Sequence, residues 1–140
     1  MSSLPQRLCN ALVGLTPEHP EALEALRPLY AHDMVFRDPI QEVRGLDAFL
    51  ALNKRLLKRM KRLHWHVSAI SGTEDEMFLE WHMSGAPTFG PAIEVSGVTR
   101  ARAHDGLIVD HRDYWDMGEM LASAVPGGQR VLHLLRLPFA

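Results

Sequence analysis

The strand predicted for residues 107–115 carries a histidine and an aspartate two positions apart. Side chains two positions apart on a strand lie on the same face, about 6–7 Å from each other. His111 and Asp113 therefore point to one side, together with the apolar residues Val109 and Trp115. A face of this kind either buries polar groups that are hydrogen-bonded or lines a cavity.

A carboxylate next to a histidine is a common arrangement for proton transfer. Desolvation in an apolar cavity raises the pKa of a carboxylate, which makes the group useful as an acid or base near neutral pH. Asp38 ends a short apolar run, and Glu80 and His82 share one face of another predicted strand. We expect Asp113 and His111 to carry acid/base chemistry, with Asp38 and His82 in support. For each residue alone a hydrogen-bonded structural role is the stronger interpretation, and only their convergence indicates a site.

Other chemistries find little support in the sequence. His64 and His66 share a strand face, but no third ligand lies at a diagnostic spacing, so we expect no metal. Phosphate-binding loops, dinucleotide fingerprints and nucleophile elbows are absent from the sequence, so we expect no cofactor. Cys9, the single cysteine, excludes an intramolecular disulfide and fits a buried structural thiol better than a nucleophile.

The composition is that of one globular domain of 140 residues, with 46% hydrophobic and 23% charged residues. A formal net charge of −2 and a pI near 6.4 give no reason to expect nucleic acid as a partner. The sequence has neither a basic leader region nor an apolar run of about 18 residues, so we expect a cytoplasmic protein without a membrane partner.

Hydrophobic periodicity predicts helices followed by a long antiparallel meander. The predicted helices span residues 4–15, 17–31, 46–62 and 117–124; the predicted strands span 34–38, 41–44, 64–72, 76–85, 92–104 and 107–115. Asp105-Gly106 is a hairpin signal, and Gly97 marks a place for a bulge or bend. This order predicts an α+β fold in which a curved sheet wraps around helices.

Two segments carry unusual side chains. Residues 126–140 form an apolar tail after the domain of residues 1–125, and we expect the tail to pack on that domain or on a second subunit. Residues 54–62 hold six of the chain's lysines and arginines. A solvated end of a helix explains this cluster best, because cations are favourable at the C-terminal end of the helix dipole. A binding surface for an anionic partner is the alternative.

Three ordered motifs resemble a known family. They are L-Y-A-H-D-M-V-F-R-D-P at residues 29–39, R-G-L-D-A-F at residues 44–49 and D-G-L-I-V-D-H-R-D-Y-W-D-M at residues 105–117. Together they resemble the SnoaL-like branch of the nuclear transport factor 2-like superfamily, which also holds ketosteroid isomerase and limonene epoxide hydrolase. The resemblance implies a cone: a bent antiparallel sheet closed by about three helices, with an apolar pocket at its open end and a homodimer formed through the sheet.

The resemblance also implies roles for single residues. Asp38 matches the aspartate of ketosteroid isomerase that moves a proton next to a carbonyl, but the positions of that enzyme's two oxyanion donors fall at Leu8 and near Thr99. Asp113 matches an epoxide hydrolase aspartate that activates water, although the region Glu80–His82 lacks the accompanying arginine. In cyclases of the SnoaL type a pocket aspartate acts with a histidine and without a cofactor.

The function implied is a pocket for a small hydrophobic molecule, with cofactor-free isomerase, cyclase or hydrolase chemistry. The residues expected to line the pocket are Trp65, Trp81, Trp115, Tyr30, Phe36, Glu80 and Thr99. A non-catalytic ligand-binding or dimerisation module of the same fold is the alternative, in which the polar residues are hydrogen-bonded core groups. The sequence leaves open whether the protein is an enzyme.

Overall fold

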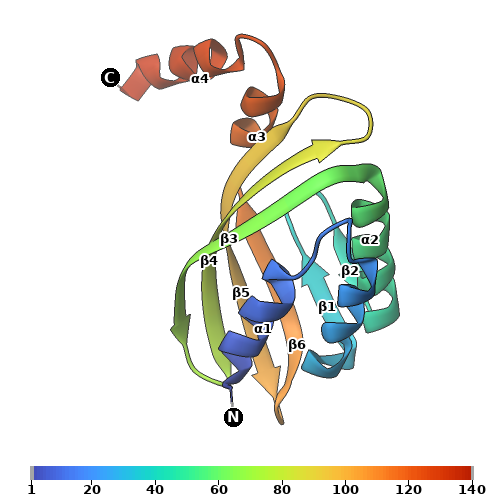
Figure 1. Cartoon of the computed structure of the whole chain (residues 1–140). Coiled ribbons are helices and arrows are strands. Elements are labelled where there is room, and N and C mark those ends of the chain that lie inside the picture. Colours follow the sequence, from blue (N-terminus) through green and yellow to red (C-terminus); the bar gives the residue numbers. More distant parts are fainter. Residues whose placement is uncertain (1, 140) are drawn as a thin grey trace.

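The computed structural model describes residues 2–139 as a curved sheet that wraps around helices (Figure 1). The six strands are β1 (Tyr30–Arg37), β2 (Glu42–Arg44), β3 (Met60–Gly72), β4 (Glu76–Pro87), β5 (Ile93–His104) and β6 (Leu107–Trp115). Their order in the sheet is β2-β1-β6-β5-β4-β3, and all neighbours are antiparallel except β1 and β6. The predicted α+β class is confirmed.

Local signals explain where the first helix and the last hairpin form. Helix α1 (Leu4–Val13) begins after Ser3, whose hydroxyl accepts a hydrogen bond from the backbone amide of Gln6. Its apolar stripe, which includes Leu8, is buried against β3 and β4. Asp105 and Gly106 have φ values of 52° and 80°, which a two-residue hairpin turn requires. That turn places β6 beside β5, as predicted.

The helix predicted over residues 17–31 is wrong. This stretch forms two 3₁₀ helices, η1 (Pro20–Ala25) and η2 (Arg27–Leu29), and Tyr30 already belongs to β1. Pro28 lacks an amide hydrogen and disfavours the helical conformation of the residue before it, so an α-helix cannot continue through it.

Helix α2 (Leu46–Arg59) also ends before its predicted limit, because Met60 and Leu63 are buried in β3. Of the cations clustered in residues 54–62, those from Lys54 to Arg59 lie on the last turns of α2. The remaining two lie in β3.

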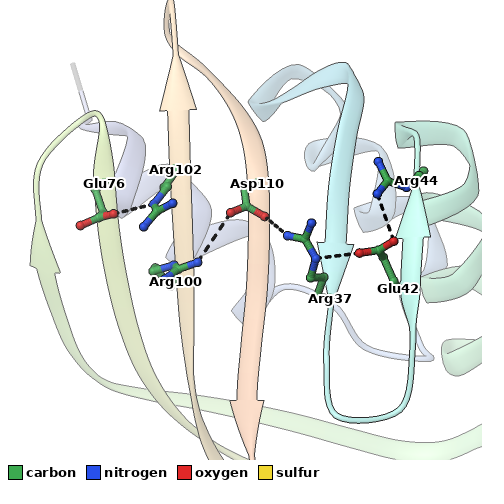
Figure 2. A network of polar contacts seen from close by, with 7 residues as sticks. All are labelled: Arg37, Glu42, Arg44, Glu76, Arg100, Arg102 and Asp110. Atoms are coloured by element: carbon green, nitrogen blue, oxygen red, sulfur yellow. Dashed lines mark hydrogen bonds and ion pairs between the residues drawn. The ribbon is translucent and has the colours of Figure 1, made fainter.

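The inner face of the sheet is apolar and the outer face is polar. Outer side chains from five strands form ion pairs between neighbouring strands (Figure 2). Arg37 contacts Glu42 at 2.7 Å and Asp110 at 3.0 Å, and Arg102 contacts Glu76 at 2.7 Å. An antiparallel meander with one solvated face has this alternation. Each exposed pair contributes little stability, on the order of 0–1 kcal/mol.

The C-terminal segment forms α3 (Met117–Ala124), α4 (Gly128–Arg136) and the 3₁₀ helix η3 (Leu137–Phe139). Helix α3 packs on β5, whereas α4 packs on α3 and extends away from the sheet (Figure 1). Val131, Leu134 and Leu135 are each about 60% exposed. That a second subunit covers this apolar tail stays a prediction. None of the described helices has the length and apolarity needed to cross a membrane.

A candidate acid/base site in an apolar cavity

A cavity of about 240 Å³ lies between the inner face of the sheet and the helices. Its walls come from α1, α2, β1, the β1–β2 turn, strands β3 to β6 and α3. The walls are mostly apolar and include the side chains of Phe36, Trp65, Trp81 and Trp115, four of the residues that were predicted to line a pocket. Asp113 and His111 also line the cavity.

Asp113 is the end point of two hydrogen-bond chains that meet at a single oxygen. His111 Nε2 lies 2.8 Å from Asp113 Oδ1, and the Thr99 hydroxyl donates to the same oxygen at 2.6 Å. Thr99 in turn accepts a hydrogen bond from Trp81 Nε1 at 2.9 Å. Asp113 Oδ2 has no hydrogen-bond partner among the described residues, and the side chain keeps 17% of its surface exposed.

The directions of these hydrogen bonds follow from the groups involved. An indole N–H can only donate, so the Thr99 oxygen accepts from Trp81 and the one Thr99 proton goes to Asp113. Thr99 and His111 therefore both engage Oδ1, and Oδ2 is the oxygen of Asp113 that meets no hydrogen-bond donor among the described residues.

Tyr30 contacts the ring nitrogen of His111 that does not face Asp113, and this contact sets the tautomer of His111. Its hydroxyl lies 2.7 Å from His111 Nδ1, and both side chains are almost fully buried. Burial raises the pKa of Tyr30 well above its usual value, and the charge of Asp113 adds to this. Tyr30 therefore keeps its proton. His111 Nδ1 is the one acceptor for this hydroxyl among the described residues, so Tyr30 donates to Nδ1, which leaves the His111 proton on Nε2, facing Asp113.

Two predicted residues lie away from the cavity. His82 and Glu80 are on the outer face of β4, where His82 contacts Ser96 at 2.9 Å and Glu80 accepts a hydrogen bond from Ser68 at 2.9 Å. The reason is strand alternation: Trp81 and its apolar neighbours on β4 fill the inner face, so the even-numbered residues point outward. The structure does not bring His82 or Glu80 to Asp113, and we leave both out of the site proposed below.

Asp38 lines the cavity, but a turn already engages its carboxylate. Asp38 Oδ1 accepts hydrogen bonds from the backbone amides of Ile40 at 2.8 Å and Gln41 at 3.0 Å. Tyr30 and Thr99, which were predicted to line the pocket, do not line the cavity. They form hydrogen bonds to His111 and Asp113, respectively, which do. Asn53 also lines the cavity and was not predicted from the sequence. It lies four positions after Phe49 on α2, and this helical spacing, which puts both residues on one face of the helix, could have indicated it.

Asp113 is also reached from outside the cone. Strand β1 pairs with β6 only as far as Arg37 opposite Arg112, and the chain then turns away at Pro39. An open cleft of about 730 Å³ lies beyond that point, and Asp38, Asp113 and Trp115 line both the cleft and the cavity. Asp113 can therefore exchange a proton with solvent without passing it through the apolar interior.

The hydroxyl of Thr99 makes a testable contribution to stability. We expect Thr99→Val to lower the free energy of unfolding by about 1–3 kcal/mol, because Trp81 Nε1 loses its acceptor in a buried site. Thr99→Ser keeps the hydroxyl and should lose much less. Urea denaturation of the three proteins measures this, and a valine variant as stable as the serine variant would contradict the network.

Burial of Tyr30 predicts a loss of stability in alkali. Its pKa in the folded protein is raised above the ordinary value of 10.0, so the folded state holds this proton more tightly than the unfolded chain. The resulting stability is present below pH 10 and is lost as the pH rises towards the folded pKa. We expect the free energy of unfolding to fall more steeply above about pH 10 in the wild type than in Tyr30→Phe. Denaturation curves across that range measure both slopes, and parallel slopes would refute the assignment.

Comparisons with known proteins agree with this geometry. The family model described as SnoaL-like domain matches residues 19–111. An LEH-like epoxide hydrolase from M. tuberculosis is similar in structure, with a TM-score of 0.71, 17% identity and coverage of 96% of each chain. No curated protein matches the chain.

Two further structures share the fold. A hypothetical protein with a ketosteroid isomerase-like fold from Catenulispora acidiphila, solved in complex with trimethylamine, has a TM-score of 0.72 and 19% identity over 89% of this chain and 96% of that one. A phenazine biosynthesis-related protein from Pseudomonas aeruginosa has a TM-score of 0.69 and 15% identity over 86% of each chain. At these identities the likeness shows the fold alone. The matched family model covers well over half of the sequence, and the chain belongs to the SnoaL-like domain family.

Proposed function

We propose that the protein is a cofactor-independent acid/base enzyme that acts on a small, mostly apolar molecule in the cavity. Asp113 is the general base, and its free oxygen Oδ2 takes the proton. The observation that carries this proposal is the convergence of Thr99 and His111 on Oδ1, which holds the side chain in one orientation and leaves Oδ2 free. A positioned base of this kind contributes typically 10²–10⁴-fold to a rate.

His111 acts through Asp113 in this proposal. Its ring is held by Tyr30 on one side and packs edge-on against Phe36, with ring centroids 5.2 Å apart. It therefore orients the carboxylate and does not need to touch the substrate. Asp38 lies at the boundary between cavity and cleft, where a second carboxylate can relay protons to solvent.

The reaction class is tested by proton exchange. A panel of small apolar ketones, lactones and epoxides is first screened by thermal shift, because a ligand that binds the folded state raises the melting temperature. Epoxides are included because one structural neighbour is described as an epoxide hydrolase. Each hit is then incubated with protein in deuterated water and followed by NMR. Deuterium entering a carbon position, or ring opening, supports the proposal; ligands that bind without any reaction favour a non-catalytic binding module instead.

We also propose a homodimer through the outer face of the sheet. Phe78 and Tyr114 are exposed there by 38% and 43%, and Arg112 stacks over the Tyr114 ring at 4.7 Å. Beside them Arg100 Nε is buried without a hydrogen-bond partner among the described residues. A second copy packed on this face would cover the apolar side chains and offer acceptors to Arg100.

A charge placed in that face should separate the subunits. We expect Tyr114→Asp to shift the protein from dimer to monomer in analytical ultracentrifugation. The apolar ring that a second copy would cover is lost, and a carboxylate beside Arg100 and Arg112 would replace the acceptors that the second copy offers. Val13→Asp introduces the same charge at an exposed apolar position on α1 and should leave the assembly unchanged. A wild-type protein that sediments as a monomer would reject this proposal.

A further inference from the structure

The cavity carries a negative charge that none of its walls neutralises. Its titratable lining consists of Asp38, Asp113 and His111, without any lysine or arginine among the described residues. The arginine next to Asp113 in sequence, Arg112, points to the outer face and stacks over Tyr114. Asp38 already accepts hydrogen bonds from two backbone amides, whereas Oδ2 of Asp113 accepts none from the described residues.

His111 does not supply the missing positive charge. The Tyr30 hydroxyl has no described acceptor other than His111 Nδ1, so that nitrogen carries no proton. With its single proton on Nε2, the imidazole is neutral and donates to Asp113 Oδ1. On its cavity side, the carboxylate of Asp113 faces mostly apolar walls, where Coulomb interactions are stronger than in water.

Aromatic side chains line the same cavity as this charge. Trp65, Trp81 and Trp115 line the cavity, and the Trp65 and Trp81 rings meet edge to face with centroids 4.9 Å apart. The faces of indole rings attract cations, and tryptophan does so most strongly among the aromatic residues. A carboxylate and several indoles around one small space favour a positively charged ligand and disfavour an anion.

The cavity also lacks a cationic group that would neutralise a negative charge on a substrate, although the indole N–H of Trp65, on its wall, is a buried donor without a partner among the described residues. Among its walls the side-chain amide of Asn53 is turned to the carbonyl oxygen of Phe49 at 2.9 Å, and that of Gln41 lies near Asp38 at 3.4 Å. A proton taken by Asp113 from a neutral carbonyl compound would leave an oxyanion without a cationic neighbour. A substrate that carries its own positive charge avoids this difficulty.

From these observations we propose that the cavity takes a small apolar molecule with a cationic nitrogen, held between the Asp113 carboxylate and the indole faces. The inference rests on the proposed function, because it assigns a substrate class to the same cavity. With a protonated imine, Asp113 Oδ2 takes the proton from the carbon next to C=N. The C–H electron pair becomes the C=C bond of an enamine, and the electron pair of C=N moves to nitrogen and neutralises it.

Three probes of one shape test the charge preference. Cyclohexylmethylammonium, cyclohexylmethanol and cyclohexanecarboxylate are titrated into the wild-type protein by calorimetry at neutral pH. We expect the ammonium to bind at least about tenfold more tightly than the alcohol, and the carboxylate not to bind. In Asp113→Asn the ammonium should fall to the affinity of the alcohol, while the affinity of the alcohol itself stays unchanged. Glu94→Gln removes one exposed carboxylate from the outer face of β5 and should behave as the wild type.

The possible failures differ from one another. Equal binding of alcohol and ammonium, or an ammonium preference that survives in Asp113→Asn, overturns the cationic class and leaves the cavity as a ligand site. The absence of binding by all three probes overturns both this inference and the use of the cavity in the proposed function.

Discussion

Asp113→Asn is expected to lower the rate of deuterium exchange or turnover by ~10²–10⁴-fold on any substrate that the wild type accepts. An asparagine side-chain oxygen can still accept the hydrogen bonds from Thr99 and His111, so the fold should be kept. What the amide cannot do is take a proton at the position of Oδ2. The measurement is the initial exchange rate by NMR, at saturating and at low substrate concentration.

The controls separate loss of the base from loss of structure. Thermal unfolding should place Asp113→Asn close to the wild type, and Glu94→Gln should keep the full rate. A variant that is stable and still active at the wild-type rate would show that Asp113 is not the base. A variant that is both inactive and strongly destabilised would instead make Asp113 a structural residue, and the alternative of a binding module would gain support.

Gly97→Ala is expected to damage both the fold and the cavity. Gly97 pairs with Trp81 on one side and Trp115 on the other. A Cβ atom at this position would lie 2.6 Å from Trp81 Cζ2 and Cη2, and 2.6 Å from the carbonyl oxygen of Tyr114. Overpacking of this kind typically costs about 1–3 kcal/mol. Because the backbone oxygen cannot move away as a flexible side chain can, we expect the upper end of that range.

A second effect of Gly97→Ala follows from the position of the Trp81 ring. A displaced indole would lose its hydrogen bond to Thr99 and would change the cavity wall. Denaturant unfolding measures the stability loss, and probe binding measures the change in the cavity. Gly14→Ala is the matched control, because its Cβ would lie 3.4 Å or more from its neighbours at a φ of −75°. Equal stability of the two alanine variants would contradict this role of Gly97.

The centre of the site could be predicted from the sequence because it depends on local geometry. His111 and Asp113 lie two residues apart on one strand, and the strand period alone places them side by side. The hairpin at Asp105-Gly106 fixed where that strand starts. The apolar alternation on β4 likewise placed Trp81 and His82 on different faces of the strand. It did not indicate which of these faces is the inner one.

The supporting contacts could not be predicted, because they depend on tertiary pairing. Tyr30 and His111 are 81 residues apart and meet only because β1 runs parallel to β6 in the sheet. The pairing of Trp81 with Thr99 depends on the register of β4 against β5. Gly97 was predicted as a bulge or bend, whereas the registers of both neighbouring strands are regular there, and the glycine leaves room for an indole.

The tautomer of His111 provides the most direct test of the account. Long-range ¹H–¹⁵N correlation NMR on ¹⁵N-labelled protein at neutral pH distinguishes the two ring nitrogens, with His111→Asn used to assign the signals. We expect a bare Nδ1 that accepts from Tyr30 and a protonated Nε2 that donates to Asp113. A bare Nε2 would contradict it, because Asp113 would then have to donate the proton in that short contact and could not be the base.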